Sequence, residues 1–249
     1  MKKRSFPWHL LALVLLIAAA FASAAFAVKP LVYNAEKTQE IKRENRQFYL
    51  NAEALKEIAE EAEQPMPYES LYRALQTYNR WLVEIRQGNL DTKRSMEIVP
   101  FSMTDYGLPG EVFGVLRIPA IELEMPIYLG ANDENMANGA AVLTQTSIPI
   151  GGESTNAVIA GHRGWNGYPY FLDIERLQEG DLVYIQNIWE ELVYKVTEIR
   201  IVYPDDVEAI LIQPGRDMIT LMTCHPPNTG GRYRYLVYCE RMIESLEQS

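Results

Sequence analysis

Two strand-like runs flank a polar loop in DMITLMTCHPPNTGGRYRYLVYCERM, residues 217–242. The runs are rich in β-branched and aromatic residues, and the loop between them carries two prolines and two glycines, which end regular structure. Earlier runs of the same kind begin after Glu111 and include VFGVLRIPAIELEMPIYLG, NAVIAGHRG, DLVYIQN and ELVYKVTEIRIVYP. Short strands at this density predict a mostly β fold, a closed or nearly closed barrel over residues 111–243.

The chain before this barrel is predicted to be helical. Residues 34–62 contain no Gly or Pro and place apolar residues at roughly helical spacing. A second amphipathic pattern follows a break at EQPMPYES and comprises Leu71, Leu75, Tyr78, Leu82 and Ile85. We therefore expect a signal or anchor segment over 1–28, a helical segment over 29–97, a lid or linker over 98–110, the barrel over 111–243 and a tail over 244–249.

The N-terminus predicts export. Lys2, Lys3 and Arg4 precede WHLLALVLLIAAAFASAAFAV, an apolar run that is close to the length needed to span a bilayer. Basic residues before the run favour a cytoplasmic N-terminus and an extracellular barrel. ASA (22–24) and AFA (25–27) both look like signal-peptidase sites, so cleavage stays open. We favour an uncleaved anchor, because ERMIESLEQS at the other end contains no second apolar span.

Composition and motifs narrow the class of function. The formal net charge of -10 argues against nucleic acid as a partner, because phosphate binding needs clustered Lys and Arg. We find no phosphate-binding glycine loop and no cofactor fingerprint. One Cys beside one His supplies too few ligands for structural zinc, so neither a metal nor a cofactor is expected.

The two cysteines, Cys224 and Cys239, could form a disulfide in an exported protein. Strand alternation argues against this, because it puts Arg232 and Arg234 on one face and Cys239 on the other. We therefore predict that Cys239 is a buried core thiol. Cys224 lies between a strand and a polar loop, and it is the candidate nucleophile if a basic or cationic neighbour favours its thiolate.

Three histidines could supply that neighbour. His9 lies in the apolar N-terminal run, and His225 directly follows Cys224, so its side chain should diverge from the thiol and is read as a rim residue. His162 ends the apolar run of VIAGHRG and is followed by glycine, a place where an imidazole can be exposed on a rigid scaffold. A structural role for this histidine remains the alternative at this point.

Several segments together resemble the sortases, which are membrane-anchored cysteine transpeptidases of mostly Gram-positive bacteria. TLMTC (220–224) is similar to their Thr-Leu-x-Thr-Cys signature, and AGHRG (160–164) to their histidine segment. Further segments follow the order seen in pilin-assembling (class C) sortases, namely FGVLRIPAIELEMPIYLGAN, TSIPIGG, FLDIERLQEGDLVYI and RYLVYCER. The resemblance covers roughly residues 98–241 and implies an eight-stranded sortase-type barrel.

The resemblance also implies a two-step acyl transfer. Cys224 would attack the Thr-Gly bond of an LPXTG-like sorting signal on a surface or pilin protein, leaving a thioester. An amine would resolve it, from a pilin lysine in pilus-building relatives or from a peptidoglycan precursor in housekeeping relatives. His162 would act as acid and base, an arginine would stabilise the oxyanion, and Thr223 would support the thiol or substrate.

The choice of arginine and the lid depart from the family pattern. Counting residues from Cys224 to the place of the family's site arginine gives Tyr233. Aligning the strand that follows the cysteine loop gives Arg234 instead, and Arg232 is the second choice. The lid of pilin-assembling relatives carries an Asp-Pro-aromatic tripeptide, and the corresponding Val99, Pro100 and Phe101 lack the acid. A plain linker is therefore the alternative to a lid. The C-terminal membrane span usual in such relatives is also missing.

Three other functions compete with that of a pilin transpeptidase. A housekeeping-type sortase would attach single proteins to peptidoglycan by the same chemistry. An extracellular binding barrel with an inactive site is a different class of protein, and the joint presence of Cys224, His162 and an arginine argues against it. An L,D-transpeptidase also uses Cys and His, but its local cysteine motif is absent.

Overall fold

The computed structural model describes residues 8–85, 87, 101–227 and 229–242. Two long helices, α1 (Trp8–Glu61) and α2 (Glu69–Glu84), precede the β-rich part of the chain. The strands are β1 (Val112–Ile118), β2 (Leu123–Leu129), β3 (Ala140–Val142), β4 (Thr155–Ala160), β5 (Arg163–Trp165), β6 (Tyr168–Tyr170), β7 (Leu182–Asn187), β8 (Glu191–Val202), β9 (Asp217–His225) and β10 (Tyr233–Arg241). The short helices are η2 (Thr104–Tyr106), η3 (Pro119–Ile121), α3 (Asp133–Asn138), η4 (Leu172–Arg176) and η5 (Val207–Ile210).

Eight of the strands close into a barrel in the order β1-β2-β3-β4-β9-β10-β8-β7, and β1 pairs with β7 to complete it. The pairs β2–β3 and β4–β9 are parallel, and the other pairs are antiparallel. β5 and β6 form a separate two-stranded hairpin outside the barrel. The predicted eight-stranded barrel is therefore confirmed.

β10 shows how the core is built from strand alternation. Tyr235, Val237 and Cys239 face the main core, whereas Leu236 and Tyr238 face a smaller apolar cluster on the other side of the sheet. Successive side chains of a strand point to opposite faces, so a strand covered on both sides is apolar throughout. Cys239 is fully buried and is a free thiol, and Cys224 is also free, as predicted.

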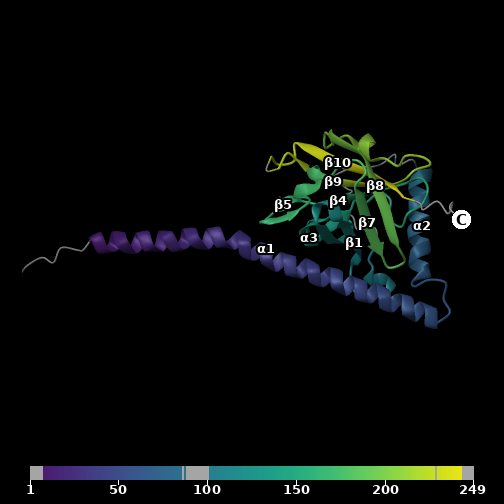
Figure 1. Cartoon of the computed structure of the whole chain (residues 1–249), viewed down its shortest axis with the longest axis horizontal. Coiled ribbons are helices and arrows are strands. Elements are labelled where there is room, and N and C mark those ends of the chain that lie inside the picture. The colour runs from purple at the N-terminus through teal and green to yellow at the C-terminus, as the bar shows by residue number, and fades with distance from the viewer. Residues whose placement is uncertain (1–7, 86, 88–100, 228, 243–249) are drawn as a thin grey trace, which may run out of the picture.

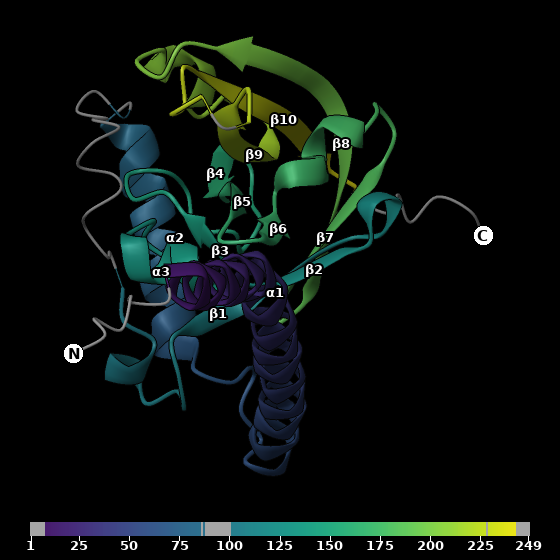
Figure 2. The same ribbon diagram turned by 90° about the vertical axis from the view of Figure 1, so that its left-hand side faces the viewer.

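The two long helices cover the barrel on different sides. α2 buries Leu71, Leu75 and Leu82 from its predicted apolar pattern. Its buried Asn79 donates from Nδ2 to the carbonyl of Ile148 at 3.0 Å and accepts from the same residue's N–H at 2.8 Å. Figure 2, in which the N-terminal half of α1 points at the viewer, shows α2 on one side of the barrel and β7 and β8 on the other.

α1 joins two segments that the sequence patterns predict as separate. The apolar N-terminal run and the helix expected from residue 34 form one helix of 54 residues that contains Pro30. A proline inside a helix removes one hydrogen bond and bends the axis without ending the helix when the flanking turns continue. Figure 1 shows the N-terminal half of α1 projecting beyond the barrel, while its C-terminal half lies against it.

Candidate active site

Cys224 is the penultimate residue of β9, and its side chain is exposed. The six preceding residues of the strand are buried, so the scaffold that carries the thiol is fixed by core packing. Thr223 is buried, and its hydroxyl donates to the carbonyl of Gly161 at 2.7 Å. The sequence therefore ends a buried strand with one exposed sulfur, which is the environment expected of a reactive rather than a core cysteine.

The two arginines proposed as alternatives occupy different positions. Arg234 lies in β10 directly opposite Cys224 in the antiparallel register, and directly opposite residues share one face of a sheet. A Cβ placed on Gly231 would meet both the Cys224 Sγ and an Nη1 of Arg234 at 3.0 Å, so the sulfur and the guanidinium flank the same point. Arg232 precedes the strand and is exposed. The structure thus brings Arg234 to the thiol.

Arg234 is held by backbone carbonyls rather than by an acid. Its Nη1 donates to the carbonyls of Gly231 at 2.9 Å and Tyr233 at 3.2 Å. Within the described part of the chain, no carboxylate forms an ion pair with this guanidinium. Its charge is therefore oriented but not neutralised, which suits it to stabilise negative charge that develops on a substrate.

His162 lies beside this pair because β4 runs parallel to β9. The Gly161 N–H donates to the Met222 carbonyl at 3.0 Å, which continues the β4–β9 register past the end of β4. His162 and Cys224 each lie two residues past the Ala160–Met222 pair of this register, so the two chain segments bring imidazole and thiol to the same barrel end. No hydrogen bond joins the two side chains among the described residues.

The imidazole of His162 is packed between aromatic rings. It stacks on Trp165 with ring centroids 5.0 Å apart and an interplanar angle of 18°, and it meets the edge of Tyr170 at 5.7 Å. Burial lowers the pKa of His162, and the carboxylate of Asp133 opposes part of this shift. A lowered pKa favours the neutral imidazole near neutral pH, the form that accepts a proton from a nucleophile.

A polar cluster around the buried Arg163, behind the site, was not found from the sequence. The guanidinium of Arg163, whose side chain is 2% exposed, forms an ion pair with Glu175. Its Nη1 lies 3.3 Å from Nδ1 of His225, which must be the acceptor because a guanidinium only donates. The same guanidinium lies over the ring of Tyr235 at 5.5 Å. His225, read as a rim residue, is therefore part of this cluster.

The cluster is related to the site by sequence position. Three of its members directly follow candidate site residues, in the pairs His162–Arg163, Cys224–His225 and Arg234–Tyr235. Because neighbouring side chains on extended chain point to opposite faces, the cluster lies behind the three site residues and ties their strands together. Alternation could have shown that these residues share a face, but not that they touch.

The segment proposed as a lid is described only in part. Phe101 packs edge-on against Tyr78 of α2, with ring centroids 5.5 Å apart, and Cys224 is exposed. Pro100 lies outside the described residues, as does most of the segment before it. The lid therefore stays a prediction. Among the described residues, no group of three His, Cys, Asp or Glu side chains is placed to hold a metal ion.

Comparison with known proteins gives one consistent family. A family model described as a sortase domain matches residues 116–242. Sortase A of Bacillus anthracis is 32% identical over 127 residues, which are 51% of this chain and 58% of that protein. Sortase D of Bacillus subtilis is 28% identical over 135 residues, which are 53% of this chain and 65% of that protein. The match thus spans between half and two thirds of the length of these curated relatives.

Solved structures match over a larger part of the chain. A structure titled "Pilus-related Sortase C of Group B Streptococcus" has a TM-score of 0.66 and 31% identity, and the match covers 80% of this chain and 97% of that one. "Sortase C1 of GBS Pilus Island 1" has a TM-score of 0.68 and 26% identity, with 81% and 98% covered. The similarity therefore extends beyond the barrel into the helical part.

Proposed function

This chain belongs to the sortase family, whose members are cysteine transpeptidases, and we propose that it cleaves an LPXTG-like sorting signal between Thr and Gly. The acyl group would then pass from a Cys224 thioester to an amine. The observation that carries this proposal is the register that sets the Cys224 thiol opposite an unneutralised Arg234.

The first half-reaction follows from the chemistry of the three side chains. Neutral His162 accepts the proton of the Cys224 thiol, the resulting thiolate attacks the carbonyl carbon of the threonine, and the carbonyl oxygen takes up negative charge. Arg234 donates hydrogen bonds to that oxygen, because its guanidinium stays charged at any relevant pH. Protonated His162 gives its proton to the departing glycine nitrogen, so the C–N bond breaks and the thioester remains.

The second half-reaction reverses these roles. Neutral His162 accepts a proton from the incoming amine, whose nitrogen attacks the thioester carbonyl. The C–S bond then breaks, and the Cys224 thiolate leaves as an amide or isopeptide bond forms. Thr223 contributes as a supporting residue, because its hydroxyl bonds the Gly161 carbonyl and so holds the histidine strand beside the cysteine strand. Arg232 is exposed in the loop before β10.

We infer that the acceptor amine is a pilin lysine and that the substrates are pilin proteins carrying a sorting signal. The support is the similarity to structures titled as pilus sortases, which includes the helical segment as well as the barrel. Attachment of single proteins to a peptidoglycan precursor is the second candidate, because two curated relatives named Sortase A are 32% identical over 127 and 124 residues.

Sortases are membrane-associated proteins of Gram-positive bacteria, and α1 is long and apolar enough to cross a membrane. We propose that its N-terminal half is an uncleaved single-pass anchor with a cytoplasmic N-terminus and an extracellular barrel. The basic residues before the apolar run support this orientation.

The proposal is tested with the full chain in detergent micelles and a panel of LPXTG-type peptides. We expect mass spectrometry to show a thioester adduct on the wild type and none on Cys224→Ala. Cys239→Ala is the matched control and should keep the adduct, because the Cys239 thiol is fully buried and burial raises its pKa far above the ordinary value. An adduct that persists in Cys224→Ala would rule the proposal out.

The acceptor is identified in a second step of the same experiment. The preformed thioester is divided between a peptide with one free lysine side chain and a synthetic peptidoglycan stem peptide with a free amine. Faster loss of the adduct with the lysine peptide supports pilin assembly. Faster loss with the stem-peptide amine favours attachment to the cell wall.

A further inference from the structure

The β5–β6 hairpin meets α1 where the apolar run of that helix ends. Asn166 and Gly167 form the turn between the two strands, both with positive φ. A Cβ on Gly167 would lie only 2.8 Å from the carbonyl oxygen of Pro30, so the tip of the hairpin touches α1 and only glycine fits there. Figure 1 shows β5 pointing from the barrel toward the projecting half of α1.

The length of the apolar run sets the depth at which this contact would lie in a bilayer. The N-terminal part of α1 has a window of mean hydropathy 2.6, none of which is buried against the protein. A helix rises 1.5 Å per residue, and a hydrocarbon layer of about 30 Å takes about 20 residues, so a run over 8–28 ends at the edge of that layer. Pro30 then lies at the level of the lipid headgroups, and the hairpin tip lies beside it.

The exposed surface of the hairpin has the composition expected at the level of the lipid headgroups. Residues 164–169, GWNGYP, carry no charged side chain. The side chain of Trp165 is 50% exposed and is paired across the hairpin with Tyr168, next to the turn. Tryptophan and tyrosine are enriched at the boundary between lipid and water, because their rings are apolar and each carries one polar group.

We propose that the β5–β6 hairpin lies on the outer surface of the bilayer that α1 crosses, with Trp165 in the headgroup region. The occupant of this surface is lipid, because the contact with Pro30 places the hairpin at the end of the apolar run. The inference rests on the uncleaved anchor proposed above, but not on the transpeptidase reaction.

This contact would connect the membrane to the candidate site. The face of Trp165 that is not exposed stacks on the imidazole of His162, and both follow β4 by a few residues. A bilayer that holds Trp165 therefore holds the ring that covers the histidine. The site end of the barrel is then turned toward the membrane, where a membrane-tethered substrate would arrive.

Tryptophan fluorescence with the full chain in phosphatidylcholine–phosphatidylglycerol proteoliposomes tests this proposal. The acyl chains carry bromine near the headgroup or near the chain end, and bromine quenches tryptophan on contact. We expect Trp165→Phe to remove emission that headgroup-proximal bromine quenches. Trp81→Phe is the matched control, because Trp81 is 48% exposed on α2 and its loss should remove only unquenched emission. Trp8→Phe reports insertion of α1 itself.

The outcomes separate the hairpin from the anchor. Loss of quenched emission in Trp8→Phe but not in Trp165→Phe would overturn the hairpin contact and leave the anchor intact. Loss in neither variant would overturn the anchor and the inference with it. If Trp165 emission is insensitive to bromine and shifts only when a protein with a sorting signal is added, the surface binds protein and the proposal is wrong.

Discussion

An arginine lies at each end of the β9–β10 pair, and the two arginines have different surroundings. At one end Arg241, the last residue of β10, belongs to a network of acids, a tyrosine and backbone groups. At the other end Arg234 lies opposite an exposed thiol, and among the described residues its guanidinium hydrogen-bonds only to backbone carbonyls. One pair of strands thus has a structural end and, under the function proposed above, a reactive end.

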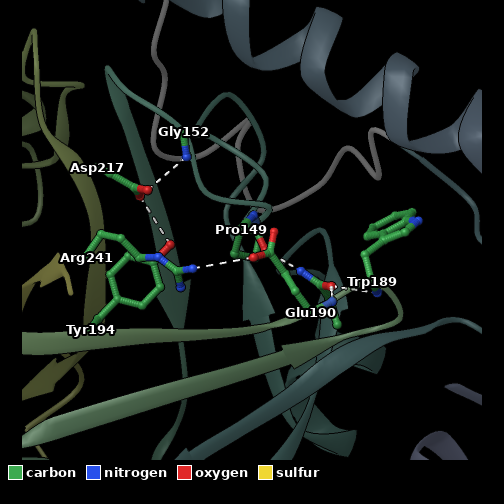
Figure 3. A network of polar contacts seen from close by, with 8 residues as sticks. Pro149, Gly152, Trp189, Glu190, Tyr194, Asp217 and Arg241 are labelled. Carbon is green, nitrogen blue, oxygen red and sulfur yellow. Dashed lines mark hydrogen bonds and ion pairs between the residues drawn. The ribbon is translucent and has the colours of Figure 1, made fainter. Parts of the chain in front are cut away.

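Figure 3 shows the structural end. Asp217 accepts from the Gly152 N–H at 2.9 Å and from the Tyr194 hydroxyl at 3.2 Å. Arg241 donates to Glu190 at 3.4 Å, and its guanidinium lies 5.6 Å from the Tyr194 ring centroid. Each charge has a partner of opposite sign or a directed hydrogen bond, as buried charged groups require.

The contrast between the two ends shows what makes an arginine available for chemistry. Arg241 and Arg163 each face a carboxylate, so their charge is already compensated and serves packing. Arg234 has no such partner among the described residues and lies beside the thiol. A guanidinium that is held but not neutralised can donate to an oxyanion that forms only in the transition state.

Removal of the reactive arginine should have the largest effect. We expect Arg234→Ala to lower the rate of thioester formation about 10²–10³-fold, the usual effect of removing an oxyanion donor. Arg232→Ala is the control and should stay within about threefold, because that side chain is exposed and precedes the strand. Stopped-flow or single-turnover mass spectrometry with an LPXTG peptide measures both. Equal losses in the two variants would contradict the assignment of Arg234.

At the structural end, Asp217→Asn should lower stability rather than activity. The substituted amide would either point its NH₂ group at the Gly152 N–H or lose the hydrogen bond that the Tyr194 hydroxyl donates. We therefore expect a loss of about 1–3 kcal/mol in the free energy of unfolding. Urea unfolding followed by tryptophan fluorescence measures this. The rate of thioester formation per folded molecule should be unchanged, and a large fall would show that the two ends are not independent.

The effect of Asp217→Asn on the free energy of unfolding should also depend on pH. Burial raises the pKa of Asp217 above its ordinary value of 3.8, although the Gly152 N–H and Arg241 oppose part of this shift. The folded chain therefore holds this proton more tightly than the unfolded chain, and the contribution of Asp217 to stability falls as pH rises through the raised pKa. The free energy of unfolding of Asp217→Asn should therefore approach that of the wild type as pH rises through the raised pKa of Asp217. A difference in the free energy of unfolding that grows with pH would contradict this expectation.

Behind the reactive end, Glu175→Gln removes the charge that compensates Arg163. We expect kcat to fall about threefold to tenfold, corresponding to roughly 1 kcal/mol, with KM unchanged. The reason is that the cluster lies on the strand faces opposite the site residues and positions those strands. Glu198→Gln removes the carboxylate of an exposed pair with Arg200 and should leave kcat unchanged. A rise in KM alone would assign Glu175 to substrate binding instead.

The smallest effect is expected from Phe101→Ala. Its ring packs on Tyr78 and Cys224 is exposed, so labelling of Cys224 by a maleimide should change by less than about twofold, as for other changes away from a reactive group. Cys224→Ala supplies the background from Cys239. A marked rise in the labelling rate would show that the segment around Phe101 covers the thiol in solution, as the lid prediction holds.

Local sequence patterns were enough to predict most of the barrel strands, but not the short β3, and to single out the candidate site residues. β-Branched and aromatic runs separated by Gly and Pro define the barrel strands, because strand propensity and turn chemistry act over a few neighbouring residues. The period of two placed Cys239 in the core, and the polar loop after Cys224 put that thiol at a strand end. These features depend on local backbone geometry, so they are readable without a partner strand.

How the reactive groups meet depends on contacts between distant strands. Counting along the chain pointed to Tyr233 and alignment of the strand pointed to Arg234, and only the register between β9 and β10 sets Arg234 opposite Cys224. The parallel pairing of β4 with β9, which delivers His162, and the burial of Arg163 against Glu175 join segments far apart in sequence. Pairing and register between distant strands are set by how all the side chains pack together, and no short stretch of sequence contains that information.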